Sequence, residues 1–359
     1  MADTYFIHAE PLSAAIRELV RGFGSEEREV QLVTDNLIQA NLTGHDSHGI
    51  GMLPRYSEAW AEGGLKANAH IKTLMDGGAL LRVDGQAGFG QVVGHEAMTL
   101  GIERAKKYGS CIMALGNSHH LCRIGAWAEM AVAEGFVSIH FVNVISRPIV
   151  APFGGRDGRF GTNPFTVGIP VAGRDPILLD FATSVIAQGK ARVAHNKREK
   201  MPLGRILDNK GKDSDDPAYA VVEPLGAILA FGEHKGYGMA VACELLGGAL
   251  SAGLVGGPAT GEKRVLNGML TIIIDPKSIS DTPTFERETR AFLDWAKASP
   301  PREGFDKVRL AGEPEREWRV KRLAEGIPVD VNTWNELLVA AQRLKVDPAK
   351  ISQLAGVKI

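Results

Sequence analysis

The sequence lacks the features of secreted, membrane-spanning and disulfide-stabilised proteins. No apolar run approaches the roughly 20 residues that a membrane-spanning helix needs, and the first residues contain no basic region followed by an apolar core. Only three cysteines occur, and each of them, Cys111, Cys122 and Cys243, sits among apolar neighbours. We therefore expect reduced thiols in a cytoplasmic protein, with neither export nor membrane insertion.

An excess of charge of one sign is also missing. The chain has 41 basic and 42 acidic residues, which gives a formal net charge of −1. This balance offers no electrostatic reason to expect nucleic acid or an anionic membrane as a partner, so a small molecule is the expected one. With 359 residues, of which 44% are apolar, the chain is long enough for a substantial core and for two domains.

Helical patterns at both ends of the chain flank a centre in which short strands alternate with helices. The predicted helices are 13–23, one capped by Ser25 that closes at 41–48, 52–60, 97–105, 124–133, 235–250, 285–298, and one to 344 that opens with a Thr333 and Glu336 capping box. The predicted strands are 80–83, 111–115, 137–143, 166–169, 177–180 and 270–274. A second domain is expected from about residue 70, and 195–216 reads as a surface loop or hairpin.

The densest polar cluster is His45-Asp46-Ser47-His48, followed by Gly49 and Gly51. Histidine titrates near neutral pH, and a neighbouring carboxylate or hydroxyl can fix its tautomer, so a proton donor and acceptor is predicted here. The same residues also fit a helix end at which the two glycines adopt left-handed conformations. We expect both descriptions to hold.

Motifs of common enzyme classes are missing. Gly88-Phe89-Gly90 has Val93 where a Rossmann fingerprint has its third glycine, and no P-loop, nucleophile elbow or H-E-x-x-H pattern is present. The residues alone therefore predict a histidine-rich active site and leave its class open.

Further polar clusters follow predicted strands or open predicted helices. Asn117 to Arg123 follows a strand end, where open sheets present catalytic groups, although Ser118 also suits a helix N-cap. Leu178 to Ser184 places an aspartate at another strand end, with Thr183 or Ser184 as a possible cap. Glu233 to Gly238 joins a histidine and a lysine at a helix start, which suits an anion.

Several stretches, including Arg159 to Phe165 and two of these clusters, carry a family resemblance. Asp46-Ser47-His48-Gly49 with Leu53-Pro54-Arg55-Tyr56 resembles the signature of the malate/L-lactate dehydrogenase family of the second, non-Rossmann type, and most of all its hydroxycarboxylate dehydrogenase branch. Asn117-Ser118-His119-His120 is similar to the second signature, and the likeness runs from 25–27 to 326–328. The resemblance implies an α/β (α+β) fold with a helical domain from both chain ends, 1–72 and 281–359, and a central mixed-sheet cofactor domain, 73–280.

The resemblance also implies the activity and its participants. The family moves a hydride between NAD, or NADP, and a 2-hydroxy or 2-oxo carboxylic acid, and its members are typically homodimers. Arg316 or Arg319 would suit the 2′-phosphate of NADP, whereas the branch favours NAD. No metal is implied.

Three residues are expected to be catalytic: Ser47, His48 and His120. His48 would be the base, oriented by Ser47, while His120 would be an alternative base or would polarise the carbonyl oxygen. Many family members have an arginine where this chain has Met52, so Arg123 is the predicted carboxylate ligand, ahead of Arg55 and Arg147. Met52 would then leave room for a bulky substrate side chain.

A larger set of residues is assigned to the cofactor by the resemblance. They are His48, Cys122, Arg123, Ile124, Thr162, Asn163, Leu178, Leu179, Asp180, Phe181, Ala182, His234, Lys235, Gly236, Asn267, Glu313, Pro314, Glu315 and Arg316.

Three alternatives stay open. A metal-dependent hydrolase or lyase would use His45, His48, His119 and His120, since the first two lie at helical i, i+3 spacing. An imine reductase of the same family would use the same catalytic residues on a different substrate. A catalytically inactive dinucleotide-binding protein is the third.

Overall fold

A seven-stranded mixed sheet forms the centre of the computed structural model, which describes residues 4–258 and 264–357. The strand order is β2-β3-β4-β11-β5-β6-β7, and among these described strands β3 and β4 make the one parallel pair. The strands are β2 Lys72–Asp76, β3 Leu80–Asp84, β4 Ser110–His119, β5 Val137–Ile145, β6 Phe165–Ile169, β7 Ile177–Phe181 and β11 Leu266–Ile274. This is not the parallel, doubly wound sheet of a Rossmann domain.

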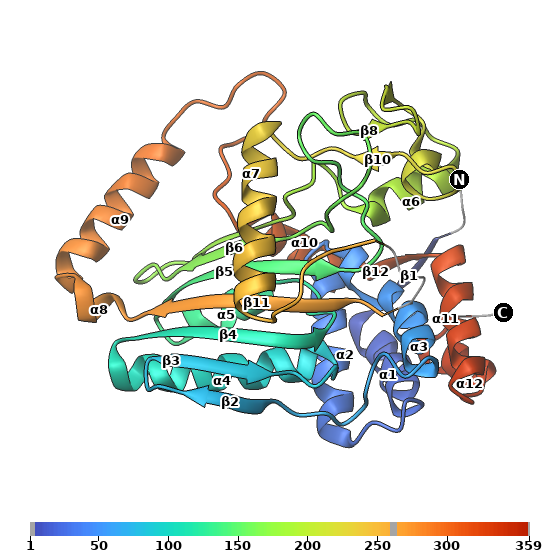
Figure 1. The fold of residues 1–359 in the computed structure, drawn as a ribbon, viewed down its shortest axis with the longest axis horizontal. Helices are drawn as coiled ribbons and strands as arrows, with labels where there is room; N and C mark the ends of the chain where they lie inside the picture. The colour runs from blue at the N-terminus through green and yellow to red at the C-terminus, as the bar shows by residue number, and fades with distance from the viewer. Residues whose placement is uncertain (1–3, 259–263, 358–359) are drawn as a thin grey trace.

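Helices cover the two faces of this sheet unequally. On one face α4 (Gly90–Tyr108) and α5 (Gly125–Ala133) bury Met98 and Trp127 against Met113 and Met269 of the strands. On the opposite face α7 (His234–Cys243) and its π-helical continuation η4 (Glu244–Leu250) cross β5 and β11 (Figure 1). The rest of that face is open, as the exposed side chains of Leu80 and Ile112 show.

The two ends of the chain meet in a separate helical region, blue and red in Figure 1. Strands β1 (Thr4–Ile7) and β12 (Ile327–Asp330) pair antiparallel. Buried residues such as Leu37 and Trp334 join the surrounding helices in one hydrophobic core. These helices are α1 Ala9–Arg21, α2 Glu27–Leu42, α3 Leu53–Ala61, α11 Val331–Arg343 and α12 Pro348–Ala355.

These layers confirm the predicted fold class, a helical region from both chain ends beside a central mixed sheet. The domain boundaries at 72/73 and 280/281 stay predictions. In the described ranges, no helix has the length and apolar character to cross a membrane.

Three smaller units complete the chain. Of the predicted loop or hairpin at 195–216, the hairpin is found where β8 (Ile206–Leu207) pairs with β9 (Asp213–Ser214), while 195–197 end a helix. Strand β10 (Ala227–Ile228) pairs with β8 from outside that range. Helix α6 (Gln188–Lys197) and the short turn η3 (Pro217–Ala220) pack beside it. After α8 (Pro276–Ile279), α9 (Thr282–Lys297) stands away from the sheet, and α10 (Glu313–Glu325) returns the chain to the helical region (Figure 1).

Several predicted helix ends were wrong. Helix α2 stops at Leu42 because Gly44 takes a left-handed conformation, with φ +85°, so 41–48 is not one helix. Its N-cap is Glu26, while the Ser25 hydroxyl bonds the Glu29 carboxylate instead. Helix α11 is capped by Asp330, which accepts from the Thr333 N–H, rather than by a Thr333 capping box.

Two predicted caps have no helix to cap. Ser118 lies inside β4, which runs on to His119. Thr183 is buried and its hydroxyl donates to the carbonyls of Thr162 and Asn163, so it ties two loops together, and the next helix begins only at Gln188.

Candidate active site

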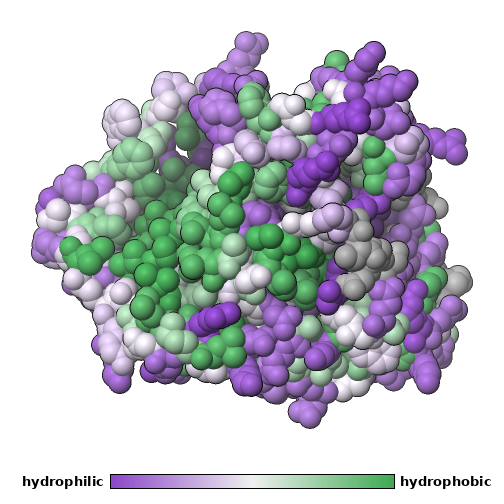
Figure 2. All heavy atoms as spheres, viewed as in Figure 1, coloured by the Kyte–Doolittle hydropathy of each residue, from purple (hydrophilic) through white to green (hydrophobic). Residues whose placement is uncertain are grey.

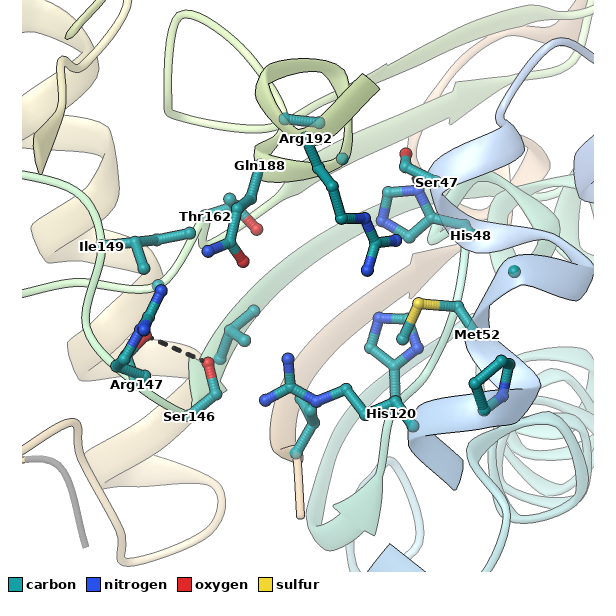
Figure 3. A pocket seen from close by; sticks show the side chains of 18 of the residues that line it. Ser47, His48, Met52, His120, Ser146, Arg147, Ile149, Thr162, Gln188 and Arg192 are labelled. Carbon is teal, nitrogen blue, oxygen red and sulfur yellow. Dashed lines mark hydrogen bonds between the residues drawn. The ribbon is translucent and has the colours of Figure 1, made fainter. Parts of the chain in front are cut away.

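A cavity of about 1170 Å³ lies where the helical region meets the ends of β4 and β5. Its lining comes from η1 (Asp46–His48), η2 (Ile50–Met52) and α3 on one side, and from 144–149, 161–164 and α6 on the other. The side chains of His48, Met52, His120, Gln188 and Arg192 point into it (Figure 3). A cleft of this size, with a few polar groups pointing inward, is typical of a small-molecule site.

The Asn41 side chain holds the turn that carries His48 through two hydrogen bonds. The Asn41 amide donates to Asp46 Oδ1 (2.7 Å) and its oxygen accepts from the Ile50 N–H (2.9 Å). Arg322 from α10 adds a two-pronged ion pair to Asp46, with N to O distances of 2.6 and 2.9 Å. The turn is therefore fixed from two different elements.

The glycine after His48 is needed for packing and not for a left-handed backbone. Gly49 has φ −91°, and Gly51 is not among the positive-φ glycines, so the predicted left-handed conformations were wrong. A Cβ on Gly49 would lie 2.1 Å from Asn41 Oδ1, which the two hydrogen bonds hold in place. The close approach of Asn41 therefore requires a residue without a side chain here.

His48 is a neutral histidine, and a side-chain hydroxyl lies within hydrogen-bond distance of one of its ring nitrogens. Ser47 Oγ lies 3.0 Å from His48 Nδ1, which leaves Nε2 as the nitrogen available to a substrate. Burial first, and then the charge of His45, lower the pKa of His48 to about 4. At neutral pH the ring is uncharged and able to accept a proton.

His120 lies parallel to His48 across the cavity floor. The ring centroids are 5.7 Å apart with 13° between the planes. The Tyr56 hydroxyl lies 2.7 Å from His120 Nδ1, and burial, followed by the charge of His48, lowers the pKa of His120 well below its usual value. The adjacent His119 does not reach the cavity: it is fully buried against the Tyr56 ring, and burial lowers its pKa to about 3.

Arginine side chains line the same cavity as the two histidines. The guanidinium of Arg192 extends from α6 toward His48 and Met52 (Figure 3), and Arg55 and Arg147 also line the cavity. Burial and then the charge of Arg147 lower the pKa of Arg55, with Arg192 adding to the effect. The cavity is therefore suited to an anion.

Arg123, the predicted carboxylate ligand, is not part of the cavity lining. Its side chain is buried and its guanidinium donates to Glu129 (2.5 Å). Because an ion pair holds it on the α5 side, the structure does not bring it to the predicted position. Met52 does line the cavity, as predicted.

Most of the residues predicted to bind the cofactor fall into two groups. His48, Cys122, Ile124, Thr162 and Asn267 line the cavity. Asn267 accepts from the Leu121 N–H and donates to the Asn143 carbonyl, and so holds the chain just after His120.

Asn163 belongs to neither group. It is fully buried, accepts from the Val144 N–H and donates to the Glu244 carboxylate (2.6 Å). Its place is structural, under the loop that carries Thr162.

The second group of predicted cofactor residues lies along β7 and at the starts of the helices near it. The Leu178 N–H donates to the Ala311 carbonyl just before α10, and Asp180 accepts from the Gly125 N–H at the start of α5 (2.8 Å). Phe181 packs on Phe231, three residues before α7 begins at His234. This strand therefore brings together three predicted stretches: Leu178 to Ala182, Glu313 to Arg316 and His234 to Gly236.

Both arginines considered for a 2′-phosphate already have partners. Arg316 Nε lies 3.2 Å from Asp175 and its Nη1 donates to the Pro176 carbonyl, while Arg319 donates to Gln39. Neither guanidinium is left without a hydrogen-bond acceptor.

Among the described residues, the metal-site alternative has no ligand set. Within 4–258 and 264–357, no three His, Cys, Asp or Glu side chains are placed to hold a metal ion. His119 faces Tyr56 rather than the cavity, so the four histidines do not converge.

Sequence reasoning missed Gln91, Gln188 and Arg192. Gln91 bonds Tyr56 and Cys122 from α4, and the other two reach the cavity from α6. None of them lies in a polar cluster of the sequence, and only the packing of α4 and α6 directs them toward the site.

The comparisons with known proteins all indicate one family of dehydrogenases and related reductases. The profile of the malate/L-lactate dehydrogenase family matches residues 7–338. Hydroxycarboxylate dehydrogenase B of Escherichia coli (strain K12) is 49% identical over 347 residues, which cover 96% of each chain.

Two solved structures share the fold over nearly their whole length. Sulfolactate dehydrogenase from Methanocaldococcus jannaschii superposes with a TM-score of 0.84 at 33% identity, over 96% of this chain and 99% of that one. Delta1-piperideine-2-carboxylate reductase from Pseudomonas syringae pvar. tomato has a TM-score of 0.79 at 29% identity, over 94% and 100%. This chain belongs to the malate/L-lactate dehydrogenase family.

Proposed function

We propose that this protein is an oxidoreductase that moves a hydride between a nicotinamide cofactor and a 2-hydroxy or 2-oxo carboxylic acid. The observation that carries this proposal is the pair of neutral, parallel histidines beside Arg192 in one cavity. Proton transfer and carboxylate binding are the two tasks that such an acid requires. The names of the relatives, hydroxycarboxylate, L-lactate and sulfolactate dehydrogenase, support the substrate class.

Different residues of the cavity take the proton, bind the carboxylate and contact the substrate side chain. His48 Nε2 takes the hydroxyl proton when the acid is oxidised, with Ser47 orienting the ring through Nδ1. Arg192 replaces Arg123 as the carboxylate ligand, because a guanidinium matches a carboxylate with two parallel hydrogen bonds. Met52 on one side of the cavity and Val144 and Ile149 on the other provide apolar surface for a substrate side chain, which supports a bulky acid.

The residues along β7 fit a nicotinamide dinucleotide, which supplies or accepts the hydride when it is bound. The start of α7 near this strand carries His234 and Lys235 and no acidic residue in its first turn, which suits a phosphate group. The first N–H of α5 is bonded to Asp180, and α10 opens with Glu313 and Glu315. Gly312 lets α10 begin close to β7, because a Cβ there would lie 3.2 Å from Leu178 Cβ. Since Arg316 and Arg319 are already bonded, we favour NAD over NADP.

An imine reductase is the second candidate. The likeness to delta1-piperideine-2-carboxylate reductase favours it, since a carbon–nitrogen double bond takes up a hydride and a proton as a carbonyl does. The same histidines and Arg192 would serve a cyclic imine that carries a carboxylate.

We further propose a homodimer formed over the open face of the sheet, and a reducing compartment such as the cytoplasm. Figure 2 shows apolar side chains collected between α9 and α7, and Leu245, Leu250, Phe292 and Trp295 on the bordering elements are exposed. Apolar surface of this kind is typical of a protein interface, and a second copy is the expected occupant.

The three free, buried cysteines fit a reducing compartment.

The test is absorbance at the reduced-nicotinamide band, with NADH and NADPH in turn. The panel contains 2-oxo acids from pyruvate and oxaloacetate to phenylpyruvate, together with a cyclic imine carboxylate. Oxidation of NADH by a 2-oxo acid is the expected result. Oxidation by the imine alone would favour the second candidate, and no oxidation by any compound would contradict both.

A further inference from the structure

The His120 side chain is the end of a hydrogen-bond chain that begins far from solvent. Tyr56 is fully buried, and its hydroxyl lies 2.7 Å from His120 Nδ1, 3.2 Å from Cys122 Sγ and 3.2 Å from Gln91 Nε2. Gln91, also buried, bonds Cys122 Sγ as well, at 2.9 Å. Three buried side chains, those of Tyr56, Gln91 and Cys122, thus lie behind the ring of His120, which lines the cavity.

The direction of the chain follows from the placement of the Gln91 amide, whose Nε2 faces Tyr56 and Cys122 while its buried Oε1 has no hydrogen-bond partner in the described part of the chain. The Gln91 amide nitrogen has two hydrogens and no acceptor capacity, so it donates to Tyr56 Oη and to Cys122 Sγ. The Tyr56 oxygen then has one hydrogen left to give. His120 Nδ1 is the nearer and stronger acceptor, whereas Cys122 Sγ is a weak one that already receives a hydrogen from Gln91.

The state of each group agrees with this direction. Burial and then the charge of Cys122 raise the pKa of Tyr56 well above its usual value, so the hydroxyl keeps its hydrogen. Burial keeps His120 neutral, so its ring carries one hydrogen only. When Nδ1 accepts from Tyr56, that hydrogen must sit on Nε2.

From this geometry we propose that Tyr56 and Gln91 are positioning residues that hold His120 as the Nε2–H tautomer, so that His120 donates a hydrogen bond to the substrate oxygen. The proposal rests on the function proposed above and gives the two histidines different tasks. Oxidation of the acid breaks the C2–H bond, and hydride leaves with its two electrons for the nicotinamide. The hydroxyl proton goes to His48 Nε2, a carbonyl forms, and His120 Nε2–H stabilises the charge on that oxygen.

The two supporting hydroxyls differ in a way that fits these tasks. Ser47 is only half-buried, and its rotating hydroxyl can donate to or accept from His48 Nδ1, so His48 is free to take up and release a proton. Tyr56 is sealed in the core and receives a hydrogen from Gln91, and its own hydrogen goes to His120, the nearer and stronger of its two acceptors. One histidine is therefore able to change its protonation while the other keeps its hydrogen.

The test uses the full-length protein, selectively labelled with ¹⁵N in the histidine rings. Comparison with His120→Gln identifies the His120 signals, and their positions report which ring nitrogen carries the hydrogen. We expect Nε2–H in the unsubstituted protein and a mixture of tautomers in Tyr56→Phe, which removes only the hydroxyl. Tyr108→Phe, an exposed tyrosine away from the cavity, is the matched control.

Kinetics supply the second readout. Tyr56→Phe is expected to lower kcat about 10- to 100-fold, below the loss for deleting an oxyanion donor outright, while KM for NADH stays within about twofold. Gln91→Met tests the chain from its other end and should shift the tautomer in the same direction, so the test does not depend on one variant folding.

Three results would overturn the proposal. They are an Nδ1–H tautomer of His120 in the unsubstituted protein, unchanged spectra and kcat in Tyr56→Phe, and a changed tautomer with an unchanged kcat. If the unsubstituted protein reduces no acid or imine, the proposed function fails, but the tautomer is still read independently from the spectra.

Discussion

Burial keeps both active-site histidines uncharged while arginines supply the positive charge beside them. The pKa of His48 is lowered to about 4, and that of His120 also lies well below its usual value. A neutral imidazole accepts a proton, and a guanidinium cannot lose one at any relevant pH. Proton transfer and anion binding are thus assigned to different residue types, His48 and Arg192.

Replacing Arg192 by glutamine should weaken binding of the acid. Loss of a charge-assisted hydrogen-bond pair costs roughly 1.5–3 kcal/mol, so kcat/KM for the acid should fall by about 10- to 100-fold, mainly through KM. Steady-state kinetics measure this change. The control is Lys190→Gln on the same helix, whose exposed side chain does not line the cavity. An unchanged KM in Arg192→Gln would mean that another arginine binds the substrate carboxylate.

The sequence allowed some of these residues to be identified and hid others. Ser47, His48 and His120 belong to contiguous polar clusters, and the structure places all three at one cavity. Arg123 follows His120 closely in the sequence. However, the backbone turns at Cys122, with φ +58°, and Glu129 holds the Arg123 guanidinium away from the cavity. Arg192 is remote in sequence, and its position depends on the packing of α6, which no local pattern encodes.

Among the elements, the turn between α2 and α3 depends most on close packing. Gly49→Ala should push Asn41 away from Asp46 and Ile50, since its Cβ would lie 2.1 Å from Asn41 Oδ1. We expect the free energy of unfolding to fall by about 1–3 kcal/mol, a typical cost of overpacking, and kcat to fall as His48 shifts. Urea unfolding and steady-state kinetics measure the two effects.

Gly51→Ala is the matched control for stability. A Cβ at Gly51 has its nearest neighbour at 3.6 Å, which is ordinary contact, so the free energy of unfolding should change little. Equal stability of Gly49→Ala and Gly51→Ala would contradict the packing role of Asn41.

Most strands and helices could be predicted because their apolar periodicity reflects burial. β3, β5 and α5 lie where the alternating and helical patterns predicted them. The end of α2 could not be predicted in the same way, because Gly44 and the Asn41 to Asp46 hydrogen bond close the helix before the polar cluster. The sequence pattern continues past Gly44, where this local turn ends the helix.

At the scale of the whole molecule, stability should fall as the pH drops from about 6.5 toward 4. Burial lowers the pKa of His119 and His140 to about 3 and that of His48 to about 4, against 6.5 for an unburied histidine. In this window the unfolded chain binds more protons than the folded one, so the free energy of unfolding rises with pH. Urea unfolding at several pH values measures the slope, and a flat profile between pH 6.5 and 4 would contradict the neutral buried state.

The open sheet face yields a prediction about assembly. Trp295→Glu should convert the proposed homodimer to monomer, because it places a charge in an apolar contact of α9. Light scattering after size exclusion measures the mass. Arg287→Glu, on a more polar part of the same helix, is the control. A monomeric unsubstituted protein, or a dimer that survives Trp295→Glu, would contradict this interface.

The most direct test of the central claim compares the unsubstituted protein with His48→Ala in the NADH oxidation assay. We expect the unsubstituted protein to oxidise NADH with a 2-oxo acid, while His48→Ala binds NADH with similar affinity and loses about 10²- to 10⁴-fold in kcat. His70→Ala, at an exposed histidine outside the cavity, should retain full turnover. Unchanged turnover in His48→Ala would remove His48 from the reaction and contradict the proposed mechanism.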